Sequence, residues 1–424
     1  MGSILFLATF SIIFSTEFSY RQTIAANEVK SLSWFNSLGG VLFCNIEIAY
    51  SVIVFVLGSK LAYSLYRLSS FHEIGRFFFD QLLVKWSILV LTSMAAYFFL
   101  SLTDEPLNQL WKSKFGADCP SVMYQVWFTF RSLILDCKVC LQWFWIMEVD
   151  ILLTLLVAPL FIIYKTKKWV GTALFALVII ISKIFAIAIL ESDNIVFEPY
   201  KLFNQSLEYT VNYQTNAIVR AAAYVMGFMV GIRVNENMEK IESGNGEDLK
   251  AVNAIRRSSK IQGIMHLVGF ALMLLTYLLI IPHLSVVEPG DKRESARVYM
   301  AMAPFGFLIG LIVFLLPCLY QAEGKATVFF KKFLGASFWT SLEKMSMGFL
   351  LLGPVVIGFT TYSMQNSIYF DFETVFVYFL GDSVIIYILT LLAISSIDNQ
   401  LMAISRWMQA KVFGNESKYS VVVI

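Results

Sequence analysis

Charged residues are scarce in this sequence. Asp, Glu, Lys and Arg make up 15% of the 424 residues, whereas hydrophobic residues make up 58%. Soluble domains carry about 25% charged residues, so this composition excludes a soluble globular protein and indicates a polytopic membrane protein. The formal net charge of +2 comes with no basic stripe that would follow a phosphate backbone. We therefore expect no nucleic-acid partner.

Histidine and cysteine are also scarce. The chain has 3 histidines and 5 cysteines, and no metal-ligand spacing beyond the short Cys137–Cys140 pair. We expect no metal site and no cofactor. The sequence has no Gly-rich phosphate loop and no nucleophile elbow, so the common soluble enzyme classes are excluded as well. His266 is the only histidine inside an apolar stretch, and it is either a candidate general base or a packing residue.

Long apolar runs are what the sequence has in abundance. Runs of spanning length predict an all-α polytopic bundle of about ten transmembrane helices. Because helices in a bilayer share one bundle, we expect a single membrane domain over residues 1–424, in contact with membrane lipids. The predicted spans are 4–20, 40–65, 82–102, 139–164, 170–190, 217–234, 261–281, 298–320, 345–362 and 374–395.

The loop charges predict an orientation. Every second loop is basic, as shown by Lys165 to Lys168 after the fourth span and Arg256 and Arg257 after the sixth. Lys and Arg favour the cytoplasmic or equivalent side, so both termini should lie on this positive-inside face. The segment 325–338, KATVFFKKFLGASF, has lysines and phenylalanines spaced for a membrane interface. The sequence does not identify the membrane, and the mitochondrial inner membrane and a secretory-pathway membrane both remain open.

Two cysteines lie in or beside the longest loop on the face opposite the basic loops. Cys119 lies within the loop and Cys140 lies just after it. They would form a disulfide on an oxidising side of the membrane, or remain two unpaired thiols on a reducing one.

The most unusual stretch is 140–159, CLQWFWIMEVDILLTLLVAP, which is long enough to span a bilayer and yet carries Glu148 and Asp150. An unpaired charge at that depth costs on the order of 3 kcal/mol or more. Arg220, in the sixth span, has the opposite charge, so we predict a structural ion pair between Asp150 and Arg220. Gly227 and Gly231 follow on the same helix and form a small-xxx-small step for close helix packing.

These residues also carry a family resemblance. Cys140, Trp145 and Asp150 resemble the C-x4-W-x4-D pattern of the acyltransferase-3 superfamily, in its nose-resistant-to-fluoxetine-like branch. RAAAYVMGFMVG, from Arg220 to Gly231, resembles the R-x3-Y-x2-G-x3-G segment of that branch. Weaker similarity covers most of the chain, and the resemblance implies an acyltransferase-3-like bundle.

The polar residues that the family is expected to use for acyl transfer are mostly replaced. Thr16 or Glu17 stands where the family's first-helix histidine is expected, Ile53 replaces an acid, and Gly353 replaces a second histidine. Of a basic pair only Lys85 remains. The resemblance therefore implies a pseudoenzyme: a catalytically degenerate protein acting as a structural or lipid-binding subunit of a larger membrane complex, with other membrane-protein subunits as partners.

An active enzyme is the alternative hypothesis. In that case Glu17 or His266 would serve as a relocated base, and the protein would move an acyl group from an acyl donor onto a lipid or sugar. Desolvation can raise the pKa of a carboxyl group far enough for such a role.

Overall fold

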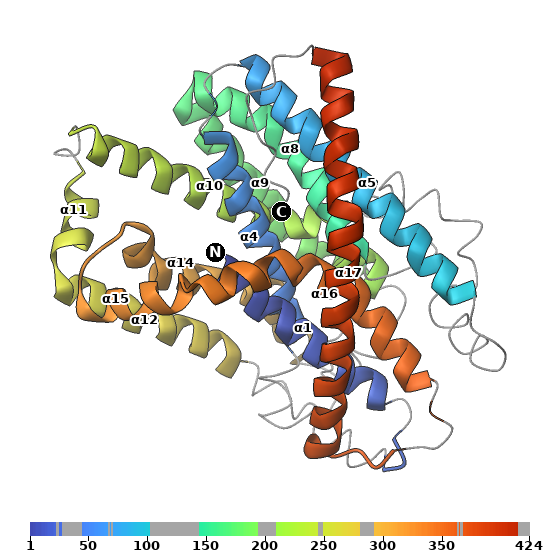
Figure 1. The fold of residues 1–424 in the computed structure, drawn as a ribbon. Coiled ribbons are helices and arrows are strands. Elements are labelled where there is room, and N and C mark those ends of the chain that lie inside the picture. The colour runs from blue at the N-terminus through green and yellow to red at the C-terminus, as the bar shows by residue number, and fades with distance from the viewer. Residues whose placement is uncertain are drawn as a thin grey trace.

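A computed structural model of the chain describes residues 1–22, 25–27, 45–66, 68, 71–101, 144–193, 209–244, 249–279, 292–362, 364 and 368–413. Within these residues the fold is a bundle of α-helices without a β-strand, and its short irregular segments lie between helices (Figure 1). The all-α fold class is confirmed.

The helices follow the predicted apolar runs closely. Nine of those in the described part of the chain are long and apolar enough to cross a membrane. The described part of the predicted span 82–102 lies within α5, which is not one of the nine. Helix α5 begins earlier, because the stretch from Phe71 onward is also helical. The elements are α1 (Gly2–Gln22), α4 (Ile46–Tyr66), α5 (Phe71–Ser101), α8 (Trp145–Thr166), α9 (Lys168–Ser192), the π-helix η3 (Tyr209–Gln214), α10 (Ala217–Glu242), α11 (Lys250–Arg257), α12 (Ser259–Leu278), α14 (Lys292–Leu319), α15 (Lys325–Leu334), α16 (Ser337–Tyr362) and α17 (Phe372–Phe413).

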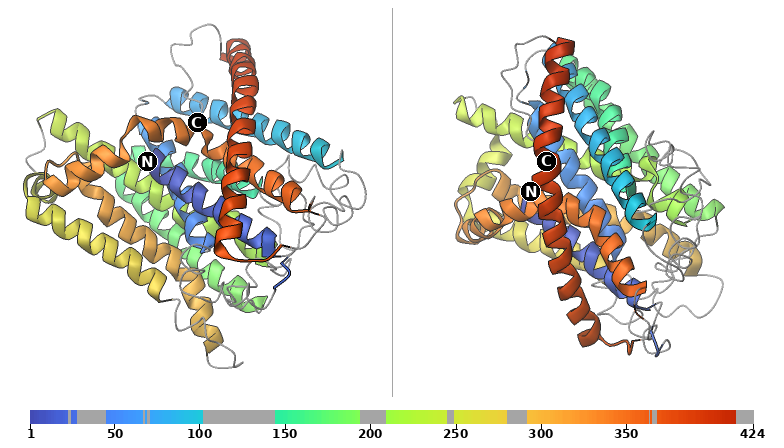
Figure 2. Two further views of the ribbon diagram at one scale, coloured as in Figure 1. Left: turned by 60° about the horizontal axis from the view of Figure 1, so that its bottom comes forward. Right: turned by 45° about the vertical axis from the view of Figure 1, so that its right-hand side comes forward.

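Helices α4 and α10 form the centre of the bundle. In each of their spans 78% of the residues are buried, compared with 28% for α9, 22% for α12 and 28% for α17. The outer helices α12 and α17 lie on different sides of the bundle (Figure 2). A helix that is apolar all round suits either a core or a lipid-facing position, so only the packing distinguishes the two groups.

Two short amphipathic helices lie beside the bundle. Helix α11 buries Val252 against Val234 of α10 and Tyr320, which follows α14. Helix α15 buries Thr327 but leaves Phe329 and Phe333 exposed. This arrangement of apolar and basic side chains is typical of a helix in the membrane interface, and an interfacial position for segment 325–338 stays a prediction.

Several helix ends meet at one end of the bundle. Tyr66 of α4 donates a hydrogen bond to Glu239 of α10, and Lys168 at the start of α9 pairs with Glu236 at 2.9 Å. Lys60 of α4 pairs with Glu343 of α16 at 2.6 Å. The C-terminal ends of α4 and α10 and the N-terminal ends of α9 and α16 therefore share this end, which we call the basic end because the basic loops lie here.

Candidate functional site

The buried charges at the centre of the bundle form what we call the central charge network, made of Glu47, Lys85, Asp150 and Arg220. They come from α4, α5, α8 and α10, and each has less than 10% of its side chain exposed. The four groups form two ion pairs, Lys85 with Asp150 and Arg220 with Glu47.

Arg220 is held from several directions. Its Nη2 lies 2.8 Å from Glu47 Oε2, its Nε donates to the Gln214 carbonyl at 2.9 Å, and Nη1 reaches Ser51 Oγ at 3.4 Å. The guanidinium also lies over the Trp145 ring, 5.2 Å from the centroid. Such a planar cation suits combined ion-pair and aromatic contacts, and these contacts fix Arg220 in one position.

Asp150 is held in a second set of contacts one helical turn away. Lys85 Nζ lies 2.7 Å from Asp150 Oδ2 and donates to Thr154 Oγ1 at 3.0 Å. The Tyr224 hydroxyl donates to Asp150 Oδ1 at 3.2 Å and lies 3.0 Å from Thr154 Oγ1. Both oxygens of the Asp150 carboxylate are therefore engaged.

The predicted ion pair between Asp150 and Arg220 needs correction. The structure pairs Asp150 with Lys85 and Arg220 with Glu47 instead. The reason is geometric: Tyr224, one turn after Arg220 on α10, faces Asp150, while Arg220 faces Trp145 and Glu47. The two sequence motifs do meet, but through Trp145 with Arg220 and Asp150 with Tyr224.

Sequence reasoning missed Glu47 as a partner, because it lies in the first turn of α4 and looked able to reach the membrane surface. One signal could have identified Glu47. It is an acid near the start of its predicted span, as Arg220 is near the start of another, and its own span has no cation near that end.

The network is closed to solvent. Tyr224 and Thr154 have 0% exposure, Trp145 has 1%, and Glu148 on the same helix is also fully buried. A proton-transfer site needs its acid or base within reach of a substrate or a water. In this conformation the arrangement can join four helices, but it offers its charged atoms to nothing outside the bundle.

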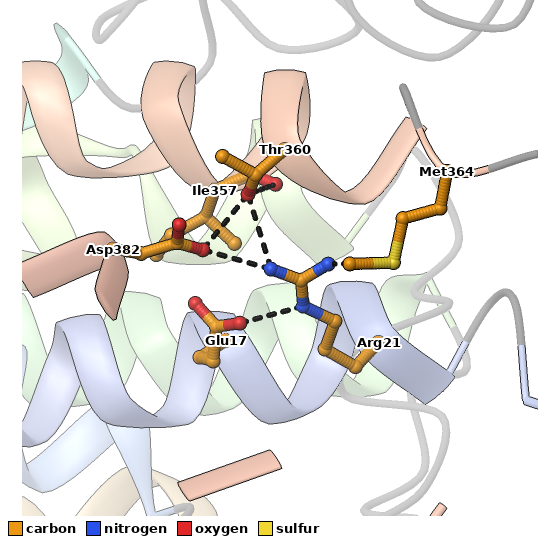
Figure 3. A network of polar contacts seen from close by, with 6 residues as sticks. All are labelled: Glu17, Arg21, Ile357, Thr360, Met364 and Asp382. Atoms are coloured by element: carbon orange, nitrogen blue, oxygen red, sulfur yellow. Dashed lines mark hydrogen bonds and ion pairs between the residues drawn. The ribbon is translucent and has the colours of Figure 1, made fainter. Parts of the chain in front are cut away.

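A second cluster of buried charges surrounds Arg21 (Figure 3). Arg21 Nε lies 2.6 Å from Glu17 Oε1, and Nη2 lies 2.8 Å from Asp382 Oδ2 of α17. The same cation donates to Thr360 Oγ1 at 3.1 Å and approaches the Met364 sulfur at 3.2 Å. Glu17, a candidate base in the sequence, is thus fully buried beside a cation. Arg21 itself was not predicted, although it lies four residues after Glu17 on the same helix.

His266, on α12, lies away from both clusters of buried charges and faces α15. Its Nε2 is 2.9 Å from Thr327 Oγ1, and its ring lies 5.0 Å from both Phe314 and Phe330, measured between centroids. The imidazole is 5% exposed. These contacts make His266 a link between two helices, and they do not bring it to Glu17 or to the central charge network.

Gly227 and Gly231 lie against α4, where the backbones come very close. A Cβ on Gly227 would be 1.9 Å from the Phe55 carbonyl oxygen, and one on Gly231 would be 2.7 Å from Ala62 Cβ. Ser59 also donates a hydrogen bond to the Gly227 carbonyl at 3.0 Å. The two glycines thus occupy the helix-packing positions expected from their spacing.

The predicted Cys119–Cys140 disulfide lies outside the described residues. Cys318, in α14, is a free cysteine. Among the residues with defined positions, no group of three or more His, Cys, Asp or Glu side chains is arranged to hold a metal ion.

A comparison with family models, curated proteins and solved structures found no match for this chain.

Proposed function

We propose that this protein is a non-catalytic membrane protein with an acyltransferase-3-like bundle, serving as a structural or lipid-binding subunit of a larger membrane assembly. The observation that carries the proposal is the pairing of its buried charges. Glu47, Lys85, Asp150 and Arg220 neutralise one another inside the bundle and are closed to solvent. Charges used for chemistry need access to a substrate, whereas charges used for helix packing need only a partner.

The state of the two candidate bases supports the same proposal. An acyltransferase needs a base that reaches the hydroxyl group it activates. Glu17 is held by Arg21, and Arg21 is shared with Asp382. His266 is enclosed by Phe314 and Phe330. The active-enzyme hypothesis has no comparable support from the geometry.

The outer helices supply a second observation for the proposal, because they expose surface that lipid or a partner protein could cover. The exposed faces of α9 and α17 are aliphatic, with Ile180, Ile184, Val377 and Val384 all more than half exposed. Such faces require lipid or other membrane helices around them. A subunit role uses part of this surface for protein and leaves the rest to lipid.

The same proposal includes an orientation. The basic end collects the helix ends that carry Lys165, Lys168, Arg256 and Arg257. The chain's first helix also starts near it, since Gly2 lies against Glu343. By the positive-inside rule this end faces the cytoplasm, or the matrix if the membrane is the mitochondrial inner one.

Native mass analysis of the protein extracted from its own membrane in mild detergent tests the proposal. We expect the chain to migrate in a stable assembly with other membrane subunits, and to show no acyl transfer when supplied with an acyl donor. A protein that runs alone under these conditions, or that transfers acyl groups in a purified state, would contradict it.

A further inference from the structure

A polar cavity opens at the basic end of the bundle. Its volume is about 880 Å³, which falls within the usual range for small-ligand sites. It lies where α10, α11 and α12 meet the connection between α14 and α15. The lining residues that bear on its chemistry are Asn253, Arg256, Arg257, Ser259, Gln321 and Gly324.

The two arginines make the cavity a site for an anion. Neither Arg256 nor Arg257 forms an ion pair with an acid in the part of the chain that the structure describes. One acid, Glu323, also lines the cavity, so the two guanidinium groups leave an excess of one positive charge. Arg side chains bind phosphate through paired N–H donors, and Ser259 and Asn253 add further hydrogen-bonding groups beside them.

A buried glutamine, Gln262, holds one wall of the cavity in place. Gln262 Nε2 donates to the carbonyls of Ile255 at 2.9 Å and Arg256 at 3.0 Å. Its Oε1 accepts from the Gly324 backbone N–H at 2.7 Å and from Thr327 Oγ1 at 3.1 Å. One side chain, 2% exposed, therefore fixes the α11–α12 turn against the segment that begins α15.

The other wall is formed by the cap at the C-terminal end of α14. Gln321 has a φ of 54°, its N–H donates to the Cys318 carbonyl, and the Ala322 N–H donates to the Pro317 carbonyl, which is a common way for a helix to end. Gly324 accepts no side chain, because a Cβ there would be 2.1 Å from Gln262 Oε1. Both features shape the same cavity.

An apolar stripe runs from the cavity along the outside of α12. Ser259, Gly263, Leu267, Phe270 and Leu274 are spaced by three or four residues, so they lie on one face of the helix. All five are exposed, with Leu267 at 69% and Phe270 at 56%. Gly263 has no atom within 4 Å of the position of a Cβ, so no other part of the described chain covers α12 at this point.

We propose that this cavity binds the phosphate-bearing headgroup of an anionic phospholipid, with the acyl chains lying along the Ser259–Leu274 stripe of α12. Arg256 and Arg257 hold the phosphate, and Gln262 positions the wall around it. The charge selects an anionic lipid over a zwitterionic one, and the apolar stripe selects a lipid over a free phosphate. The inference rests on the proposed function only in treating the chain as a lipid-binding membrane protein.

Lipid retention by the purified full chain tests this site. The protein is exchanged into nanodiscs or detergent containing equal amounts of phosphatidylglycerol and phosphatidylcholine, and bound lipid is counted by native mass spectrometry. We expect preferential retention of phosphatidylglycerol, and on the order of a tenfold loss of that preference in the double variant Arg256→Gln, Arg257→Gln. The matched control is Lys331→Gln, Lys332→Gln, which removes the same charge at the same end but outside the cavity lining, and it should lower the preference clearly less than the arginine variant does.

Three results would overturn the site. Equal retention of the two lipids would show that the site does not select an anionic lipid. An equal loss of preference in the lysine control would show that the preference comes from diffuse basic charge and not from the cavity. Displacement of the lipid by millimolar inorganic phosphate would show that the cavity recognises the phosphate alone and not the lipid. Thermal unfolding of each variant shows whether it is folded; if the double arginine variant is unfolded, the single variant Arg257→Gln, at an exposed side chain that lines the cavity, must lower retention. A chain that binds the lipid but runs alone would support this site and contradict the subunit proposal. A chain that runs in an assembly but shows no preference for the anionic lipid would contradict this site and leave the subunit proposal standing.

Discussion

At the scale of single residues, the central charge network shows how a membrane bundle tolerates four ionisable side chains in its interior. Each cation has a carboxylate within 2.8 Å, and the neutral groups Tyr224 and Thr154 add hydrogen bonds to Asp150 and Lys85. A buried ion pair is weak evidence for net stabilisation, but breaking one leaves an uncompensated charge. The stability of the bundle should therefore depend on keeping both members of a pair.

A double-mutant cycle on Lys85 and Asp150 measures this dependence. Lys85→Met and Asp150→Asn should each lower the free energy of unfolding, by ~3–5 kcal/mol where a bare charge is left behind. The double variant should lose less than the sum of the two single losses, since no charge remains unpaired. The measurement is denaturant unfolding in micelles or bicelles.

The control for that cycle is the pair Lys168 and Glu236, in which Lys168 is 59% exposed and Glu236 is 10% exposed and also lies 3.5 Å from Arg233. Its coupling should be about 1 kcal/mol or less, because Lys168 is well solvated and Glu236 keeps a second cation when Lys168 is removed. Additive losses at Lys85 and Asp150 would show that the pair does not act as a unit.

At the scale of helices, the contact between α4 and α10 organises the interior. Gly58 and Gly227 let the two backbones approach so closely that a Cβ on Gly58 would lie 2.2 Å from the Tyr224 carbonyl oxygen. In lipid there is little hydrophobic gain from bringing helices together, so close backbone packing of this kind supplies much of the association energy. The same crossing sets the position of Arg220 and Tyr224 relative to α4 and α8.

Gly227→Ala tests the crossing. The added methyl group meets backbone atoms of Phe55, which cannot rotate away, so α4 and α10 must separate. We expect a loss of ~1–3 kcal/mol in the free energy of unfolding, the usual range for overpacking.

The matched control is Gly381→Ala on α17, where nothing lies within 4 Å of a Cβ. This variant should leave stability unchanged or raise it slightly, since Ala favours a helix more than Gly does. Equal losses at the two positions would mean that helix propensity, and not the crossing, decides the result.

At the scale of the whole molecule, the arrangement of helix ends gives the bundle a polarity. The basic end holds the C-terminal ends of α4 and α10 and the N-terminal ends of α9 and α16 (Figure 1). The Arg21 cluster joins α1, α16 and α17 near the other end of α1 (Figure 3). The cavity, α11 and α15 all belong to the basic end, where anionic lipid headgroups would be met.

Cysteine labelling tests this polarity. In a background with the 5 native cysteines changed to serine, Ser243→Cys and Ser337→Cys should react with an impermeant maleimide from the same side as an N-terminal epitope tag. Ser192→Cys, at the far end of α9, should react only from the opposite side. Labelling of all three positions from one side would contradict the arrangement.

The sequence by itself determined the fold class and the positions of the helices, because a bilayer demands long apolar runs with internally satisfied backbones. It also identified the residues of the buried interior, including Asp150, Arg220, Gly227 and Gly231, because charges and small residues stand out in such runs. Only the tertiary structure decided which charge pairs with which. Asp150 meets Lys85, and Arg220 meets Glu47, because the tilt and rotation of each helix come from packing against its neighbours, as at Gly227, and this rotation is not encoded in the apolar pattern. The cavity near Arg256 likewise depends on Gln262 bridging segments about 60 residues apart in the chain, a contact that no local pattern specifies.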